Sequence, residues 1–205
     1  YSLRDPDPTS SMPMPMASNV GDTSQGGRVA LTWQQDRWEL TAGVDGRQSE
    51  HRRRSAMGKG AYRAQPWTED ARFRTVGVFA ESHWHLDEVH HLLSAVRIDR
   101  AQVDDLRASI GSGAMAMPNP TAGQRRSDTL PGGFVRYEHD MGSALGWYAG
   151  IGHAARMPDY WELFSPNRGP AGAANAFAGV QPEHTTQLDA GLQYRRGNLE
   201  AWASA

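Results

Sequence analysis

The feature that most constrains this chain is a strict alternation of apolar and polar residues within paired segments. Val29, Leu31 and Trp33 alternate with polar or small residues, and after residues 35–37 the same alternation continues over residues 38–44. A period of two residues places successive side chains on opposite faces of a β-strand. The two segments therefore predict a hairpin with one apolar face and one polar face.

The same pattern recurs further along the chain, which predicts about eight antiparallel strands in meander order. The expected strands cover residues 28–35, 38–50, 72–85, 89–104, 132–140, 144–156, 184–195 and 198–205. The 22 glycines and 12 prolines in 205 residues also favour strands and loops over helices. The predicted fold class is all-β.

The connections between these strands alternate between short and long. Short turns are expected near residues 35–37, 86–88, 139–143 and 195–198, and long polar segments near residues 5–26, 46–71, 101–131 and 156–184. Loops longer than about 15 residues are uncommon in compact soluble domains, whereas outer-membrane barrels combine short periplasmic turns with long extracellular loops. The pattern favours a membrane barrel over a soluble β-domain, which remains the alternative. A fragment of such a barrel is expected to form a curved open sheet with two edges.

A barrel in a membrane assigns a different environment to each face of the sheet. The side chains expected to face lipid are those of Val29, Leu31, Trp33, Leu40, Val44, Leu188 and Leu192. The side chains expected to face the lumen are those of Arg28, Thr41, Arg97, Asp99, Gln187 and Asp189. An aromatic girdle is expected beside the short turns, at Trp33, Trp38, Trp84 and Tyr194.

Composition and motif content exclude several classes of function. The net charge of −2 argues against a nucleic-acid partner. The lack of cysteine removes disulfides, thiol catalysis and cysteine-based metal sites, and the sequence has no apolar run long enough for a membrane-spanning helix. The sequence also lacks the local motifs of serine hydrolases, zinc proteases and nucleotide-binding enzymes. No catalytic residue and no cofactor are therefore expected, and an outer-membrane hydrolase remains an alternative.

Methionines alternate in two of the long segments. Prolines separate Met12, Met14 and Met16, and Met115 and Met117 repeat the same spacing. An extended backbone directs alternate sulfur atoms to one side, and thioethers are soft ligands that select Cu(I) over hard cations. These five methionines are the predicted metal ligands, and filler in a low-complexity loop is the alternative interpretation.

Two further clusters invite a functional interpretation. His83 and His85 share a strand face, as zinc or copper ligands can, but His90 and His91 point to opposite faces of the next strand. A solvated turn is the favoured interpretation of these histidines. Residues 51–54, His-Arg-Arg-Arg, are expected to form a basic loop that either is solvated or meets lipopolysaccharide phosphates.

Two coupled blocks are the most specific feature of the sequence. Residues 155–170 contain Arg-x-Pro followed by Glu-Leu-Phe, and residues 181–194 contain Pro-Glu-x-Thr followed by Asp-x-Gly. In these blocks the chain resembles the TonB-dependent outer-membrane receptors. The matching residues are Arg156, Pro158, Glu162, Leu163, Pro182, Glu183 and Gly191. A structural role is expected for them, in which Arg156 pairs with Glu162 or Glu183.

The resemblance implies a section of a large barrel of about 22 strands. Residues 1–205 are then a partial transmembrane β-barrel domain, and the plug domain and the remaining strands are expected elsewhere in a larger protein. Residues 158–166 resemble the copper receptors of this family most, and the resemblance implies that the principal copper ligands of that subfamily lie outside residues 1–205.

The function implied by the resemblance is energised uptake of a metal, copper or a metal complex, across the Gram-negative outer membrane. The TonB complex is expected to contact parts of the protein outside this chain. Outer-membrane lipid and lipopolysaccharide are expected to surround the barrel. A passive porin or an adhesin barrel is the alternative from another class.

Overall fold

The computed structural model describes residues 16–57, 61–111, 116–165 and 173–205. Its main feature is one antiparallel sheet of eight strands in the order β1-β2-β3-β4-β7-β8-β9-β10. The strands are β1 (Met16–Gln35), β2 (Trp38–Met57), β3 (Thr68–His85), β4 (His90–Asp105), β7 (Arg125–Met141), β8 (Leu145–Arg156), β9 (Glu183–Arg196) and β10 (Leu199–Ser204). The predicted all-β meander of about eight strands is confirmed.

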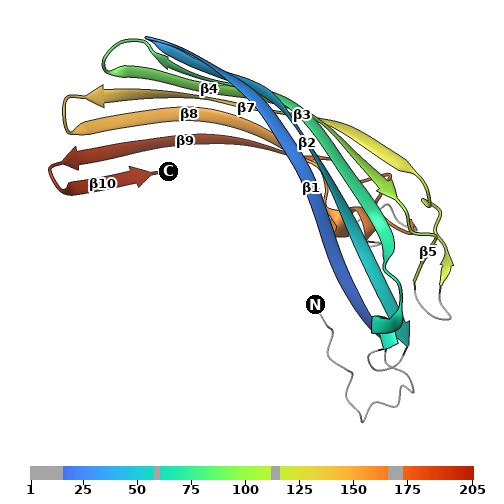
Figure 1. The fold of residues 1–205 in the computed structure, drawn as a ribbon. Helices are drawn as coiled ribbons and strands as arrows, with labels where there is room; N and C mark the ends of the chain where they lie inside the picture. The colour runs from blue at the N-terminus through green and yellow to red at the C-terminus, as the bar shows by residue number, and fades with distance from the viewer. Residues whose placement is uncertain (1–15, 58–60, 112–115, 166–172) are drawn as a thin grey trace.

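The sheet is an arch that does not close on itself (Figure 1). Within the described residues, β1 and β10 each pair with a neighbour on one side only, so the predicted open sheet with two edges is confirmed. The short connections lie at one end of the sheet, called here the turn end, and the long connections lie at the other, called the loop end. Four short elements occupy the loop end: η1 (Ala61–Ala64), β5 (Ser109–Ile110), β6 (Met117–Pro118) and α1 (Tyr160–Phe164).

No helix among the described residues has the length and hydrophobicity needed to cross a membrane.

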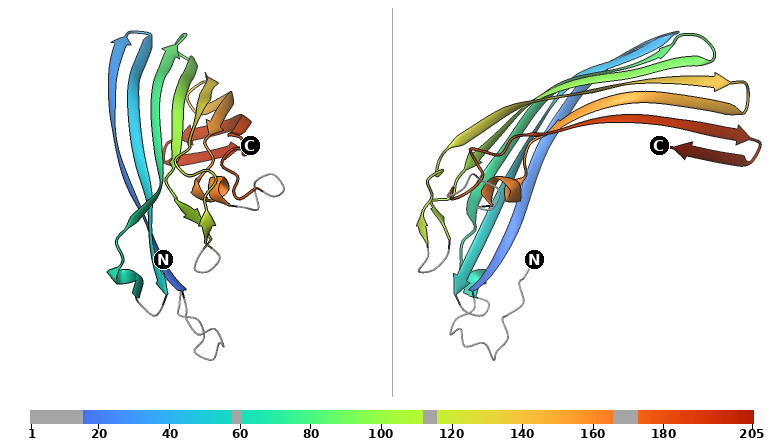
Figure 2. Two further views of the ribbon diagram at one scale, coloured as in Figure 1. Left: turned by 90° about the vertical axis from the view of Figure 1, so that its right-hand side faces the viewer. Right: turned by 180° about the vertical axis from the view of Figure 1, so that it is seen from behind.

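The register of the strands separates the side chains into two faces. Val29 pairs with Val44, Val44 with Val78, and Val78 with Ile98, so a row of apolar side chains crosses four strands on one face. Helix α1 packs on the opposite face, under the arch (Figures 1 and 2). We call the apolar convex face the outer face and the face that carries α1 the inner face.

The predicted sidedness is confirmed by this register. All seven residues expected to face lipid lie on the outer face, and all six polar residues expected to face the lumen lie on the inner face. The aromatic residues expected beside the short turns also lie on the outer face. Trp38 stacks on Trp84 with 5.9 Å between their ring centroids, and Tyr194 is the register partner of Leu145. The outer face therefore carries an apolar band with an aromatic border at the turn end.

Two glycines at the turn end adopt the left-handed backbone that tight turns require. Gly142 has φ +75° in the connection of β7 to β8, and Gly197 has φ +60° in the two-residue connection of β9 to β10. A positive φ at the first residue of a two-residue hairpin loop is the requirement of a type II′ turn. Glycine meets this requirement readily because it has no side chain to clash with the backbone.

The strands extend much further toward the loop end than the sequence pattern predicted. Residues 16–26, 51–57 and 125–131 were expected in long polar loops but continue β1, β2 and β7. A strand of 20 residues, the length of β1, spans about 66 Å, whereas the apolar band of a barrel is about 25 Å tall. The extensions lie beyond the apolar band, where polar residues occupy both faces, and therefore lack the alternation that identifies a strand.

The prediction of a basic loop at residues 51–54 was wrong for this reason. These residues belong to β2, and their side chains alternate between the two faces. His51 is buried on the inner face, and Arg53 Nε lies 3.4 Å from the Asp70 carboxylate on that side. The Arg54 guanidinium lies on the outer face, 4.6 Å from the ring centre of Trp67.

Candidate functional site

Helix α1 anchors the long connection between β8 and β9 to the inner face. Asp159 caps the helix: its carboxylate accepts from the Glu162 amide at 2.8 Å, and the Glu162 carboxylate accepts from the Asp159 amide at 2.9 Å. Leu163 and Phe164 enter a small buried cluster whose other members are Ala71, Val103 and Phe177. This apolar cluster is continuous with the inner face at the loop end, so the connection folds back under the arch rather than away from it.

The residues of the family signature fasten this connection to the sheet. Arg156, the last residue of β8, donates to Glu162 at 2.9 Å and to Glu183, its register partner on β9, at 3.1 Å. The structure thus contains both of the pairs that were considered for Arg156. Pro158 is buried between the strand and the helix, where its fixed φ ends the strand.

Two other members of the signature lie at the end of the connection and within the following strand. Pro182 immediately precedes β9. Gly191 lies in β9 opposite Tyr148, and a side chain at position 191 would meet the Tyr148 ring. The Arg136 guanidinium covers the other part of that ring at 3.7 Å. The contacts of the signature residues thus lie in the wall and in one connection, as a structural role would require.

A network of buried polar side chains lies on the inner face at the loop end. The Tyr160 hydroxyl donates to Asp70 at 3.1 Å, and the Tyr160 ring stacks on His51 at 3.5 Å between centroids. Burial, followed by the nearby Asp70 carboxylate, raises the pKa of the Tyr160 phenol well above its usual value. The phenol therefore keeps its proton and remains a donor to Asp70.

A second part of the network surrounds Asp105, which is fully buried. Its carboxylate accepts from Arg107 at 2.9 and 2.8 Å, from Asn119 at 2.9 Å and from Thr121 at 2.7 Å. Arg107 also lies 3.9 Å above the Phe164 ring. A carboxylate with this many donors is satisfied as it stands, so Asp105 positions the connections and leaves no free ligand for a metal.

An ion-pair network crosses the middle of the inner face. Arg97 on β4 reaches over β3 to the Asp45 carboxylate on β2, with two contacts of 2.7 Å, and also binds Asp99 at 2.6 Å. The residue under this bridge is Gly77, and a side chain there would collide with Asp99 and Arg97. The inner face therefore presents fixed, paired charges toward the lumen, as expected for a surface in contact with water.

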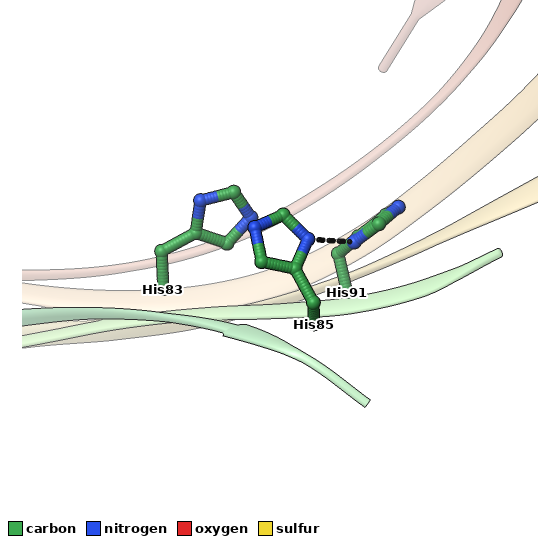
Figure 3. A group of neighbouring side chains, drawn as sticks. All are labelled: His83, His85 and His91. Atoms are coloured by element: carbon green, nitrogen blue, oxygen red, sulfur yellow. Dashed lines mark hydrogen bonds between the residues drawn. The ribbon is translucent and has the colours of Figure 1, made fainter. Parts of the chain in front are cut away.

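The histidines near the β3–β4 turn form a compact cluster on the inner face at the turn end. His83, His85 and His91 each offer a nitrogen atom, and these atoms lie within 4.8 Å of one another. The Nδ1 atoms of His85 and His91 are 2.9 Å apart (Figure 3). His90 lies on the outer face, stacked on His139 at 4.4 Å. All four residues belong to the strands that flank the β3–β4 turn, and His90 and His91 lie on opposite faces of β4, as expected from the sequence.

The predicted methionine site falls largely outside the described residues. Met12, Met14 and Met115 lie outside them, and Met16 is described only as the first residue of β1. Met117 lies in β6, and its side chain is 57% exposed. Both β6 and the start of β1 are at the loop end (Figure 1). The register adds a methionine that the sequence pattern did not reveal, because Met57 on β2 is the partner of Met16.

Comparisons with known proteins place the chain in a family. Residues 5–205 match the family model described as TonB dependent receptor-like, beta-barrel. The chain belongs to the TonB-dependent receptors. It is similar to the solved structure titled "Copper transporter OprC", with 50% sequence identity and a TM-score of 0.87 over 98% of this chain and 32% of that chain. No curated protein matches the chain.

A second solved receptor shares the fold alone. The ferric-catecholate import receptor Fiu from K12 E. coli, in its closed form, matches with a TM-score of 0.54 and 12% identity over 88% of this chain and 29% of that chain. The chain spans about a third of the length of either solved receptor.

Membership of the family orients the sheet in the outer membrane. Barrels of this kind have short turns on the periplasmic side and long loops on the extracellular side. The turn end of the sheet is therefore periplasmic, the loop end is extracellular, and the outer face contacts lipid. The histidine cluster lies at the periplasmic rim and Met117 lies on the extracellular side.

Sequence reasoning missed two features of the inner face. The Asp105 network joins residues of two long connections, and the Arg97–Asp45 bridge joins strands that are not adjacent. Both need the register of several strands, which the sequence pattern of single hairpins does not contain.

The pairing of Met57 with Met16 was also missed. The one available signal for it was the symmetry of the first hairpin about residues 36 and 37, which makes positions 16 and 57 partners.

Proposed function

We propose that the receptor to which this chain belongs takes up copper across the outer membrane with energy from the TonB complex. The observation that carries the proposal is the 50% identity over 98% of this chain to a structure titled as a copper transporter. The likeness to the ferric-catecholate receptor supports the fold alone, since only 12% of residues are identical.

The chain supplies part of the barrel in this proposal. The plug domain, the further strands and the segment that contacts the TonB complex belong to other parts of the receptor. The inner face, with the Arg97–Asp45–Asp99 network, supplies a polar wall against which a plug can move. Energised rearrangement of the plug then opens a path for the metal along this wall.

The methionines provide a capture site for Cu(I) on the extracellular side. Met12, Met14 and Met16 alternate with proline in one segment, and Met115 and Met117 repeat the spacing in another. Thioether sulfur matches the softness of Cu(I). A segment that orders on binding loses conformational entropy, so the affinity is modest and exchange is fast. Such a site suits transfer of the metal better than its storage.

The outer face above the apolar band is suited to contact lipopolysaccharide. Arg74 and Arg125 both bind Asp104 there, at 2.9 and 2.6 Å, and Arg54 lies against Trp67. Guanidinium groups form strong paired hydrogen bonds with phosphate. We propose that these outward-facing arginines, rather than a loop tip, meet the phosphates of the outer leaflet.

Metal uptake by cells that express the complete receptor tests the substrate. Cells lacking their own copper receptor are supplied in parallel with limiting copper, zinc and a ferric catecholate, and their metal content is compared with that of cells carrying an empty vector. The proposal predicts a gain in copper alone. A gain in iron from the catecholate without a gain in copper would contradict it and identify a metallophore receptor.

The methionine site is tested by replacing its sulfur atoms while retaining apolar bulk. The triple change Met12→Leu, Met14→Leu and Met16→Leu in the complete receptor is expected to slow copper uptake at low supply and to leave barrel assembly unchanged. Unchanged uptake, together with no Cu(I) binding by a peptide of residues 9–18, would return these methionines to the role of loop filler.

A further inference from the structure

We propose that His83, His85 and His91 form a binding site for a divalent transition metal, Cu(II) in preference to Zn(II), at the periplasmic rim of the inner face. The existence of the site depends only on the geometry of the cluster. Its role rests on the proposed function: in a copper receptor it is the last protein site met by copper that passes through the barrel as Cu(II), and copper held as Cu(I) by the methionines does not change its oxidation state there.

The backbone register brings the three imidazoles together. His83 and His85 are two residues apart on β3 and therefore share a face, and His91 on β4 is the register partner of His85. Side chains directly opposite each other on antiparallel strands have Cβ atoms about 4.5–5.5 Å apart. The His85 ring centre is 4.4 Å from that of His83 and 4.9 Å from that of His91. Figure 3 shows the three rings raised on the same side of the strands.

The spacing of the nitrogen atoms suits a metal with square-planar geometry. Two nitrogens bound side by side at about 2.0–2.1 Å from a square-planar metal are about 2.9 Å apart, and in a tetrahedral site about 3.3 Å. The Nδ1 atoms of His85 and His91 are 2.9 Å apart because they share a hydrogen bond, which a bound metal would replace at the same separation. Square-planar ligation by nitrogen and oxygen is characteristic of Cu(II), which also forms the most stable divalent complexes of its row.

A carboxylate orients the ring of His91 for metal binding. The Nε2 atom of His91 lies 3.5 Å from the Asp140 carboxylate at the end of β7. In the tautomer that carries its hydrogen on Nε2, the Nδ1 lone pair of His91 is directed at His85. Metal-binding histidines generally have such a partner on their second nitrogen. A change of tautomer at His85 then frees its Nδ1 atom as well, with no net release of protons.

Carboxylates on the neighbouring strands compensate the charge of a bound dication. Glu39 on β2 is the register partner of His83, and Glu138 on β7 is the register partner of His91. Arg136, which pairs with Glu138 at 2.8 Å, is the facing cation on the same strand. The apolar core of the described residues lies at the opposite end of the sheet, so the three imidazoles are not part of it.

Cu(II) binding by the complete receptor in detergent tests the site. Metal-stripped receptor is titrated with a copper(II) salt, and bound copper is quantified and examined by electron paramagnetic resonance. His85→Gln and His91→Gln are each expected to bind one equivalent of Cu(II) less than the unaltered receptor. Their spectra are also expected to lack the nitrogen hyperfine pattern of the missing Cu(II) ion. His90→Gln is the matched control, because His90 adjoins His91 but lies on the outer face; it is expected to bind as the unaltered receptor does.

Equal stoichiometry and equal spectra in all four proteins would overturn the site. Asp140→Asn tests the positioning role of the carboxylate. This variant is expected to bind the same number of Cu(II) ions, but the affinity of the histidine site for Cu(II) is expected to fall about tenfold. An unchanged affinity would remove Asp140 from the account.

The role at the exit is tested separately by copper uptake. With copper supplied as Cu(II), His85→Gln is expected to lower the initial rate of uptake severalfold while His90→Gln does not. Equal rates in a receptor that does import copper would overturn the exit role. If the unaltered receptor imports no copper but still binds the additional equivalent through His85, the proposed function fails and the metal site stands.

Discussion

The turn end and the loop end of this sheet are built on different principles. At the turn end, the strands lie in the apolar band and obey a simple rule, with Val29, Val44, Val78 and Ile98 in one outward row. At the loop end the same strands carry polar residues on both faces, and order comes from a small buried cluster around Leu163 and from the Asp105 and Asp70 networks. Where the strands contact lipid, apolar and polar residues must alternate along them. Beyond the lipid, the fold is held by contacts between the chain's own side chains.

The largest expected effect comes from placing a charge on the lipid-facing side of the band. Val96 is an outward side chain in β4, 63% exposed in the isolated sheet, and Val96→Lys is expected to cost about 2–4 kcal/mol near the midplane. The amount of folded receptor in the outer membrane, measured by its resistance to unfolding in cold detergent, should fall to a small fraction. The matched control is Ala95→Lys, one residue away on the inner face and opposite Glu81. An equal loss of folded receptor in Val96→Lys and Ala95→Lys would contradict the assignment of the outer and inner faces.

A cavity under α1 is expected to have a smaller and local effect. Leu163 is fully buried, and Leu163→Ala should cost about 2–3 kcal/mol of local stability. Hydrogen exchange of the Leu163 and Ser165 amides, which bond to Asp159 and Trp161, should then become about 30–150-fold faster. Trp161→Ala is the control, because this side chain of the same helix is 67% exposed. Barrel assembly should be unchanged in both variants, and a loss of assembly in Leu163→Ala would show that the two ends are not independent.

The smallest of these effects is expected from removing the cap of α1. Asp159→Ala deletes the acceptor of the Glu162 amide, which typically costs about 1 kcal/mol. Exchange of the α1 amides should become about fivefold faster, and Asp159→Asn, which keeps an acceptor oxygen, should restore most of the protection. Exchange that is unaffected by Asp159→Ala would mean that packing of Leu163 alone holds the connection.

The comparison of the two ends also explains what could be predicted from the sequence. Strand order, sidedness and the girdle at Trp38 and Trp84 followed from alternation, because hydrocarbon on one face and water on the other produce a period of two. The extension of β2 over residues 51–57 could not be predicted in this way, since polar residues occupy both of its faces. The network around Asp105 depends on two long connections meeting in space, and no local pattern encodes it.

The candidate sites also differ in how far the sequence alone predicts them. The signature residues Arg156 and Glu162 were recognised because a family pattern contains them, and their contact follows from the turn into α1. The cluster of His83, His85 and His91 was visible as a composition, but its significance depends on the register that sets His91 opposite His85. The methionine site remains a prediction of the sequence.

The proposed import of copper by an energised route is tested by the initial rate of radioactive copper uptake. Cells producing the complete receptor are compared with otherwise identical cells that lack the TonB complex, at copper concentrations too low for passive entry. Energised import predicts uptake that saturates with copper and falls to the background rate without the TonB complex. Uptake that proceeds equally without the TonB complex, in proportion to the copper supplied, would contradict it and identify a passive porin.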